Sequence, residues 1–185
     1  MCTSKMKQDK ELAILETAIG MIRQGGYNCF SFRNIATAIG VKSSSVHYHF
    51  ATKEDLIVAV TKHYAKIFFE ALEDPKTLIS KGEDPIAAYV SVFRGELVGD
   101  QGMCLCGVLG AEANELSELI LEETRTFFSR NVDWLKQAYL LKGVDENSAY
   151  KKALQAISCL EGAMLICNAN GDLSVFDLST EHLLT

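Results

Sequence analysis

Apolar side chains recur every three or four residues along most of the chain, which is the spacing of a helix with one buried face. One such row runs from Leu12 to Ile22 and ends at Gly25-Gly26. Another runs from Leu56 to Ala71 and predicts a helix over residues 53–72, roughly 30 Å long. No segment shows the alternation of apolar and polar residues typical of a half-buried strand. We therefore expect an all-α fold.

Capping residues mark where further helices begin. Asp84-Pro85 combines a capping side chain with a proline at the first helical position. Asp145 is the expected cap of a later helix, and Thr52 that of the helix over 53–72. The other predicted helices cover residues 85–98, 103–113, about 116–141, 146–169 and about 174–183.

The chain divides after its N-terminal third. Pro75 and Pro85 are its only prolines, and they lie in a run from Glu73 to Pro85 that we interpret as a loop. The expected architecture is a three-helix N-terminal head, residues 1–52, joined by a long helix to a C-terminal bundle, with residues 53–185 forming this second part.

The most informative segment runs from Ser31 to Phe50. Ser31 is placed to cap a short helix in which Ala36 is small enough for a second helix to cross closely. Gly40 follows that helix, where glycine adopts a left-handed turn at least cost, and Val46 can pack back on it. This spacing is typical of a helix-turn-helix motif, whose second helix enters the major groove of DNA.

The second helix of this motif, about Ser43–His49, is poor in aliphatic residues. Its polar groups have no core to join, so they must meet water or a ligand such as DNA phosphates and base edges. The alternative is an exposed polar turn between two packed helices. The residues expected to contact DNA on this basis are Lys42, Ser43, Ser44, Ser45, His47, Tyr48 and His49.

The segments Phe30–Ala36 and Val46–Leu56 together resemble the DNA-binding signature of the TetR family of transcriptional regulators. The resemblance covers about the first third of the chain. It implies a homodimer that binds double-stranded DNA through its heads and a small-molecule effector in its C-terminal bundle. The subunits would pair through helices about 146–169 and 174–183, with hydrophobic contacts from Leu160, Met164 and Phe176.

The same resemblance adds DNA contacts outside the second motif helix. Ser31 and Lys53 stand at positions whose counterparts in the family face a phosphate. Arg33, which follows Ser31 on the first motif helix, completes the predicted DNA-binding set. His47 stands where many members carry a tyrosine that touches the DNA backbone.

The overall charge would argue against a nucleic-acid partner, because 18 Lys and Arg residues face 24 Asp and Glu residues, a net charge of −6. The charge is segregated, however. Residues 1–66 carry nine basic and five acidic side chains, net +4, while the other 119 residues carry nine basic and 19 acidic, net −10. A basic head can approach DNA while the acidic body limits non-specific adhesion.

The six cysteines are sparse and form no C-x-x-C pair. The chain length, the polar N-terminus and the sparse cysteine spacing predict a reduced, cytoplasmic chain, and the lack of a long apolar run predicts no membrane span. We expect neither a metal nor a cofactor. Cys104 and Cys106 diverge by about 200° on a regular helix. Either both are small core residues, or one is a reactive thiol, as in some TetR-like regulators that sense electrophiles. A metal site assembled from Cys104, Cys106, Cys159 and Cys167 is disfavoured, because Cys159 and Cys167 are two helical turns apart and one ion could not easily take both.

Aromatic residues gather in the C-terminal part and could line an apolar effector cavity, although each taken singly is more readily explained as a core residue. Glu112 either orients a ligand there or is simply exposed. The predicted ligand-binding residues are Tyr89, Phe93, Met103, Cys104, Leu109, Phe127, Trp134 and Cys159.

Three functions compete at this point. The favoured one is a ligand- or redox-responsive transcriptional repressor, which is not an enzyme. A thiol enzyme using Cys104 or Cys106 needs a nearby base, yet no histidine lies near this pair in the sequence. A structural helical dimer or adaptor leaves the Ala36, Gly40 and Val46 spacing without a reason.

Overall fold

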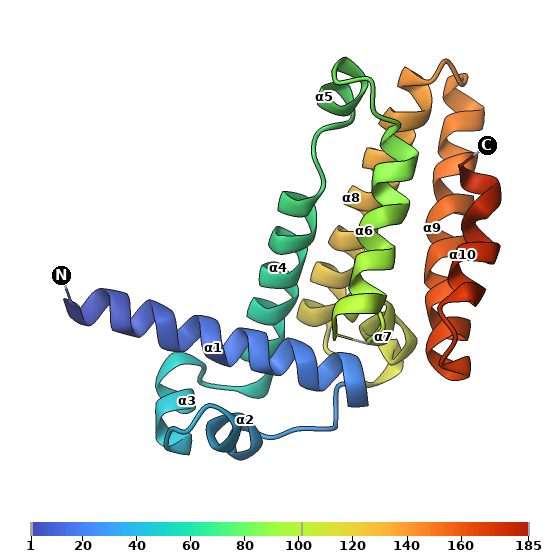
Figure 1. The fold of residues 1–185 in the computed structure, drawn as a ribbon. Coiled ribbons are helices and arrows are strands. Elements are labelled where there is room, and N and C mark those ends of the chain that lie inside the picture. Colours follow the sequence, from blue (N-terminus) through green and yellow to red (C-terminus); the bar gives the residue numbers. More distant parts are fainter. Residues whose placement is uncertain (1, 101, 185) are drawn as a thin grey trace. The chain divides into compact units, whose positions relative to one another are not determined.

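The structure is a computed structural model that describes residues 2–100 and 102–184 (Figure 1). All regular structure in these residues is helical, so the expected all-α fold is confirmed. None of the helices in these residues is long and apolar enough to cross a membrane. The chain packs as two compact units, which are described separately below.

The first unit comprises the chain up to Lys66 together with Leu105–Thr124. Within it, α1 packs on the short α2 of the helix-turn-helix, and α2 packs on α3 (Figure 1). The expected boundary at residue 52 falls inside this unit and stays a prediction. The elements are α1 (Cys2–Gly25), α2 (Phe32–Ala38), α3 (Ser43–His49), most of α4 (Lys53–Ala71), α7 (Leu105–Ala111), η1 (Ala113–Glu115) and the start of α8 (Glu118–Leu141).

The second unit comprises Ile67–Cys104 and the chain from Arg125 onward. Within it, α9 packs along α10 and also contacts α6 (Figure 1). Besides the ends of α4 and α8, the elements are α5 (Pro75–Ser80), α6 (Pro85–Asp100), α9 (Glu146–Asn170), α10 (Ser174–Thr180) and η2 (Glu181–Leu183).

The expected helix starts are confirmed. The Thr52 hydroxyl accepts a hydrogen bond from the backbone N–H of Asp55 at 3.0 Å. The Asp84 carboxylate accepts one from the N–H two residues on at 2.8 Å. Asp145 accepts from the N–H groups two and three residues on, both at 3.1 Å. These side chains satisfy backbone donors that the helix itself leaves unpaired.

The loop prediction for Glu73 to Pro85 is wrong, because this run contains α5. Asp74 caps α5 by accepting from the N–H of Lys76 at 2.8 Å, and Pro75 occupies the first helical position. This is the same Asp-Pro start that correctly predicts α6. Helix α1 also begins earlier than its apolar row, at Cys2.

Candidate nucleic-acid interface and effector site

The core of the helix-turn-helix is built as the sequence predicts. Val46 is fully buried and Ala36 nearly so, and Gly40 turns the chain between α2 and α3 with a φ of +69°. The rings of Phe32 and His47 meet edge to face, with centroids 4.6 Å apart. These contacts hold α3 against α2 and leave its other side in solvent.

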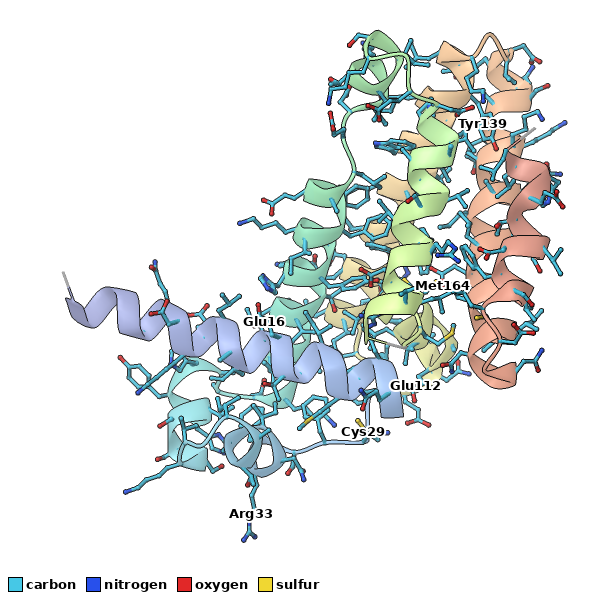
Figure 2. All side chains as sticks on the ribbon, in the orientation of Figure 1. Glu16, Cys29, Arg33, Glu112, Tyr139 and Met164 are labelled. Atoms are coloured by element: carbon cyan, nitrogen blue, oxygen red, sulfur yellow. The ribbon has the colours of Figure 1, made fainter. Side chains whose placement is uncertain are left out.

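The solvent side of this motif carries most of the predicted DNA contacts. Tyr48 is 72% exposed, and Arg33 points away from the helices (Figure 2). Ser43 and Ser45 are half-buried. The exposed members of the predicted set are Ser31, Arg33, Lys42, Ser44, His47 and Tyr48.

Ser31 is the N-cap of α2, as expected. Its hydroxyl accepts from the backbone N–H of Asn34 at 3.3 Å, while its own N–H donates to the Asn34 side-chain oxygen at 2.9 Å. This reciprocal pair is a capping box. It fixes the start of α2, and the phosphate contact expected of Ser31 stays a prediction.

Two predicted contacts, His49 and Lys53, turn inward. The His49 side chain is only 4% exposed, and its Nδ1 lies 3.6 Å from the Glu11 carboxylate on α1. Lys53 Nζ lies 4.4 Å and 4.8 Å from the ring centroids of Tyr27 and Phe30. Burial lowers the pKa of Lys53, while the charges of Cys29 and Glu112 act to raise it. Both side chains help to hold the head together, so their contacts with DNA remain predictions.

The motif alone does not indicate Lys7, which the structure brings to the recognition helix. Lys7 Nζ on α1 lies 5.1 Å from the ring centroid of Tyr48 on α3. It places a positive charge beside the exposed side of α3. The excess of lysines over acids before Glu11 is the only sequence signal for this role.

Glu112 is neither a ligand-orienting group nor a free surface residue, the two roles considered for it. Its carboxylate accepts the backbone N–H of Tyr27 at 2.7 Å, and the Glu115 carboxylate accepts from the Asn28 side chain at 2.6 Å. Both acids therefore anchor the turn between α1 and α2. Gly26 makes this possible, since a Cβ there would lie 2.3 Å from a Glu112 oxygen. Figure 2 labels Glu112 near this turn.

Four predicted ligand-binding residues converge in the second unit. The Tyr89 ring lies 5.3 Å from that of Phe93 and 5.2 Å from that of Trp134. Phe68, which the sequence did not single out, lies 5.2 Å from Phe127 and 5.5 Å from Phe93. We call these five side chains the aromatic cluster.

A polar pair is enclosed beside the aromatic cluster. The Tyr89 hydroxyl donates to the side-chain oxygen of Asn131 at 2.5 Å, and the Asn131 amide donates to the carbonyl of Phe127 at 2.8 Å. Burial raises the pKa of Tyr89 well above its usual value, with a further rise from Cys104 and Glu161. The phenol is therefore neutral near pH 7 and acts as a hydrogen-bond donor.

The other predicted ligand-binding residues do not join this cluster as a group. Met103 is half-buried and Cys104 is buried in the second unit. The Cys159 thiol donates to the Ser179 carbonyl on α10 at 3.4 Å, and Leu109 belongs to the first unit. Their roles in binding remain predictions.

The two candidate redox thiols are enclosed. Cys104 and Cys106 are 1% and 0% exposed, and they fall in different packing units. A thiol reacts with an electrophile only where the reagent reaches it, so a reactive role would require local opening. In the described part of the chain, no three His, Cys, Asp or Glu side chains gather in a way that could hold a metal ion.

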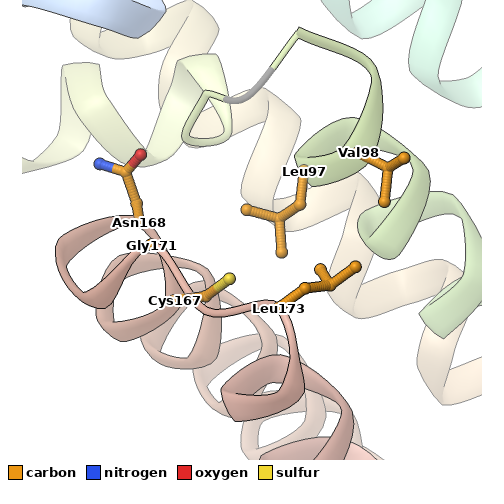
Figure 3. A pocket seen from close by; sticks show the side chains of 6 residues that line it. All are labelled: Leu97, Val98, Cys167, Asn168, Gly171 and Leu173. Carbon is orange, nitrogen blue, oxygen red and sulfur yellow. The ribbon is translucent and has the colours of Figure 1, made fainter.

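A hollow of about 390 Å³ lies where the ends of α6 and α9 meet in the second unit (Figure 3). None of the predicted ligand-binding residues lines it. The sequence does not indicate this hollow, because the aliphatic and small residues around it are of the same types as those of an ordinary hydrophobic core. The lining residues are Leu97, Val98, Cys167, Asn168, Gly171 and Leu173.

The expected contacts between subunits need correction. Leu160, Met164 and Phe176 are fully buried inside the protomer, because they lie on the faces of α9 and α10 that form its own core. Other apolar side chains of these two helices are exposed to solvent. They are Tyr150, Leu154, Leu165, Ile166 and Leu178.

Two family models match the chain. Residues 14–60 match the bacterial regulatory proteins of the tetR family. Residues 84–182 match the C-terminal domain of LmrA/YxaF-like transcriptional regulators, and this match alone covers more than half of the chain.

Individual relatives agree with these models. A TetR transcriptional regulator from Legionella pneumophila is 31% identical, with a TM-score of 0.86 over 92% of this chain and 93% of that one. A TetR-family regulator from Agrobacterium tumefaciens is 28% identical, with a TM-score of 0.81 over 96% and 97%. The fatty acid metabolism regulator protein of Bacillus subtilis (strain 168) is 25% identical over 55% of this chain. The matched segment covers only 52% of the length of that relative. The chain is therefore a transcriptional regulator of the TetR family.

Proposed function

We propose that the protein is a repressor that binds operator DNA as a homodimer and releases it when an effector binds the second unit. The observation that carries this proposal is the solvent side of α3, where Ser44 and Tyr48 stand exposed on a helix that Val46 anchors from behind. A ring as exposed as that of Tyr48 gains little from packing, whereas it can contact a phosphate or a base edge. The net charge of +4 over residues 1–66 favours approach to DNA.

The effector response is proposed for the second unit because apolar rings and a few polar groups meet there, as in many small-molecule sites. The dimer can adopt conformations that differ in the spacing of its two heads. An effector that binds one of these conformations more tightly would shift the dimer toward it. DNA affinity then falls by the difference in effector affinity between the two states. Modification of Cys104 or Cys106 has less support as a trigger, because both thiols are enclosed.

Pairing of subunits through α9 and α10 is proposed from the exposed apolar side chains of these helices. Leu165 and Leu178 are 58% and 72% exposed, and a second copy would remove such side chains from water. The thiol-enzyme alternative has no specific observation in its favour.

The recognition helix gives a direct test. Replacing both Ser44 and Tyr48 with alanine is expected to weaken binding to the DNA upstream of the protein's own gene about 30-fold or more. Two lost contacts of about 1–3 kcal/mol each account for this. Fluorescence anisotropy with labelled DNA measures it.

The matched control changes two exposed residues of α8, Ser129→Ala with Gln137→Ala. It should bind DNA as the wild type does. Both double variants should unfold within about 2 °C of the wild type, because substitutions at exposed positions change stability little. Wild-type DNA affinity in the Ser44 and Tyr48 variant would refute the assigned role of α3.

A further inference from the structure

Glu161 on α9 is an enclosed carboxylate in the second unit. Both of its carboxylate oxygens are inaccessible to solvent, and neither has a hydrogen-bond partner of good geometry among the described residues. Two titratable groups interact with it: the Cys104 thiol, which lowers the pKa of Glu161 through a side-chain hydrogen bond, and the Tyr89 phenol, whose own pKa Glu161 helps to raise. Among the described residues, no basic side chain contributes to its pKa.

A carboxylate in this setting is unstable as an anion. Removing a charge from water costs several kcal/mol unless a counter-charge or hydrogen bonds replace the water. Burial accordingly raises the pKa of Glu161 to about 7, against the opposing effect of Cys104. In the unliganded protein a proton offsets part of this cost, and a bound cation could offset it in the same place.

The neighbours of Glu161 are suited to a cation that also carries apolar groups. Tyr89, whose pKa Glu161 helps to raise, belongs to the aromatic cluster, and its apolar rings suit the apolar groups of such a cation. The hollow between α6 and α9 lies further along α9. Asn168, one of its lining residues, follows Glu161 by seven residues, or about 10 Å, on the same side of the helix. Its volume of about 390 Å³ is in the range of small-molecule sites.

We propose that the second unit recognises a cationic effector, an organic amine or quaternary ammonium ion, whose charge is held by Glu161 beside Tyr89 and whose apolar part extends toward the α6–α9 hollow. This inference rests on the proposed function, because it names the chemical class of the effector. It assigns to Glu161 a binding role that its position in the sequence did not indicate.

The test compares two probes of equal shape that differ in charge. Benzyltrimethylammonium carries the charge, and neopentylbenzene is its neutral isostere. Trp134 is the only tryptophan of the chain and its ring lies 5.2 Å from that of Tyr89, so its fluorescence reports binding without a label. At pH 8 the wild type is expected to bind the cation at least ten-fold more tightly than the isostere.

Variants at Glu161 assign this preference to the carboxylate. Glu161→Gln keeps the shape and removes the charge, and Glu161→Met provides a second folded variant if the amide is poorly accommodated. Both should lose the preference for the cation, because its desolvation is no longer offset by a carboxylate. Glu146→Gln makes the same charge change at an exposed position of α9 and should keep the wild-type preference.

The pH dependence provides an independent readout. The preference of the wild type for the cation should grow from pH 6 to pH 8, since Glu161 loses its proton in this range and the Tyr89 phenol stays neutral. Equal binding of the two probes by the wild type, or a preference that survives in Glu161→Gln, would overturn the inference. The titration contains no DNA, so a failure of operator binding is seen separately and concerns only the proposed function.

Discussion

Replacing Phe127 with alanine is expected to lower the free energy of unfolding by about 3–5 kcal/mol, the usual cost of removing a buried aromatic ring. Phe127 is fully buried and packs against Phe68 of the aromatic cluster and against Phe69, with ring centroids 5.2 Å and 5.9 Å away. The truncation would leave a cavity that these rings cannot fill. Urea unfolding followed by circular dichroism measures the loss.

Two variants serve as controls for this result. Phe127→Leu retains most of the volume and should cost about 1–2 kcal/mol. Phe128→Ala removes the same ring from the next position of α8, which is only half-buried, and should cost clearly less than Phe127→Ala. A loss below about 1 kcal/mol for Phe127→Ala would mean that the rings do not pack as described.

Replacing Gly26 with alanine is expected to cost about 2–4 kcal/mol, from two separate effects. Gly26 has a φ of +84°, a conformation that alanine adopts at a cost of about 1–2 kcal/mol. The new Cβ would also lie 2.3 Å from a Glu112 oxygen. The carboxylate would have to move and give up its hydrogen bond from the Tyr27 N–H.

The chain contains a control that separates the two effects. Gly40 also has a positive φ, +69°, but a Cβ there would meet nothing within 4 Å. Gly40→Ala should therefore show only the backbone cost. In a Glu112→Ala background, Gly26→Ala should fall to that same cost, as measured by urea unfolding of all four variants. If the loss in free energy of unfolding were unchanged in that background, Glu112 would not stabilise this turn.

Local signals account for what the sequence predicts correctly. The Ala36, Gly40 and Val46 spacing, the caps at Thr52, Asp84 and Asp145 and the helical periodicity all act within a few residues. The predicted aromatic set also largely converges, because large apolar rings have few places to go other than the core.

The errors over Glu112 and the subunit contacts come from contacts between distant segments. Glu112 lies 85 residues from its partner Tyr27, and no pattern in the sequence around Glu112 indicates that contact. Leu160 and Met164 show apolar periodicity, but periodicity does not distinguish the protomer's own core from a subunit interface. The groups that interact with Glu161, Cys104 and Tyr89, lie far from it along the chain.

Selection of bound sequences from a random pool of double-stranded DNA tests the central claim most directly. A homodimer with one α3 in each head should enrich a palindrome whose half-sites lie about one helical turn apart, roughly 10 base pairs. The Ser44→Ala and Tyr48→Ala double variant should not enrich it. A pool that shows no enriched sequence with the wild-type protein would contradict the account.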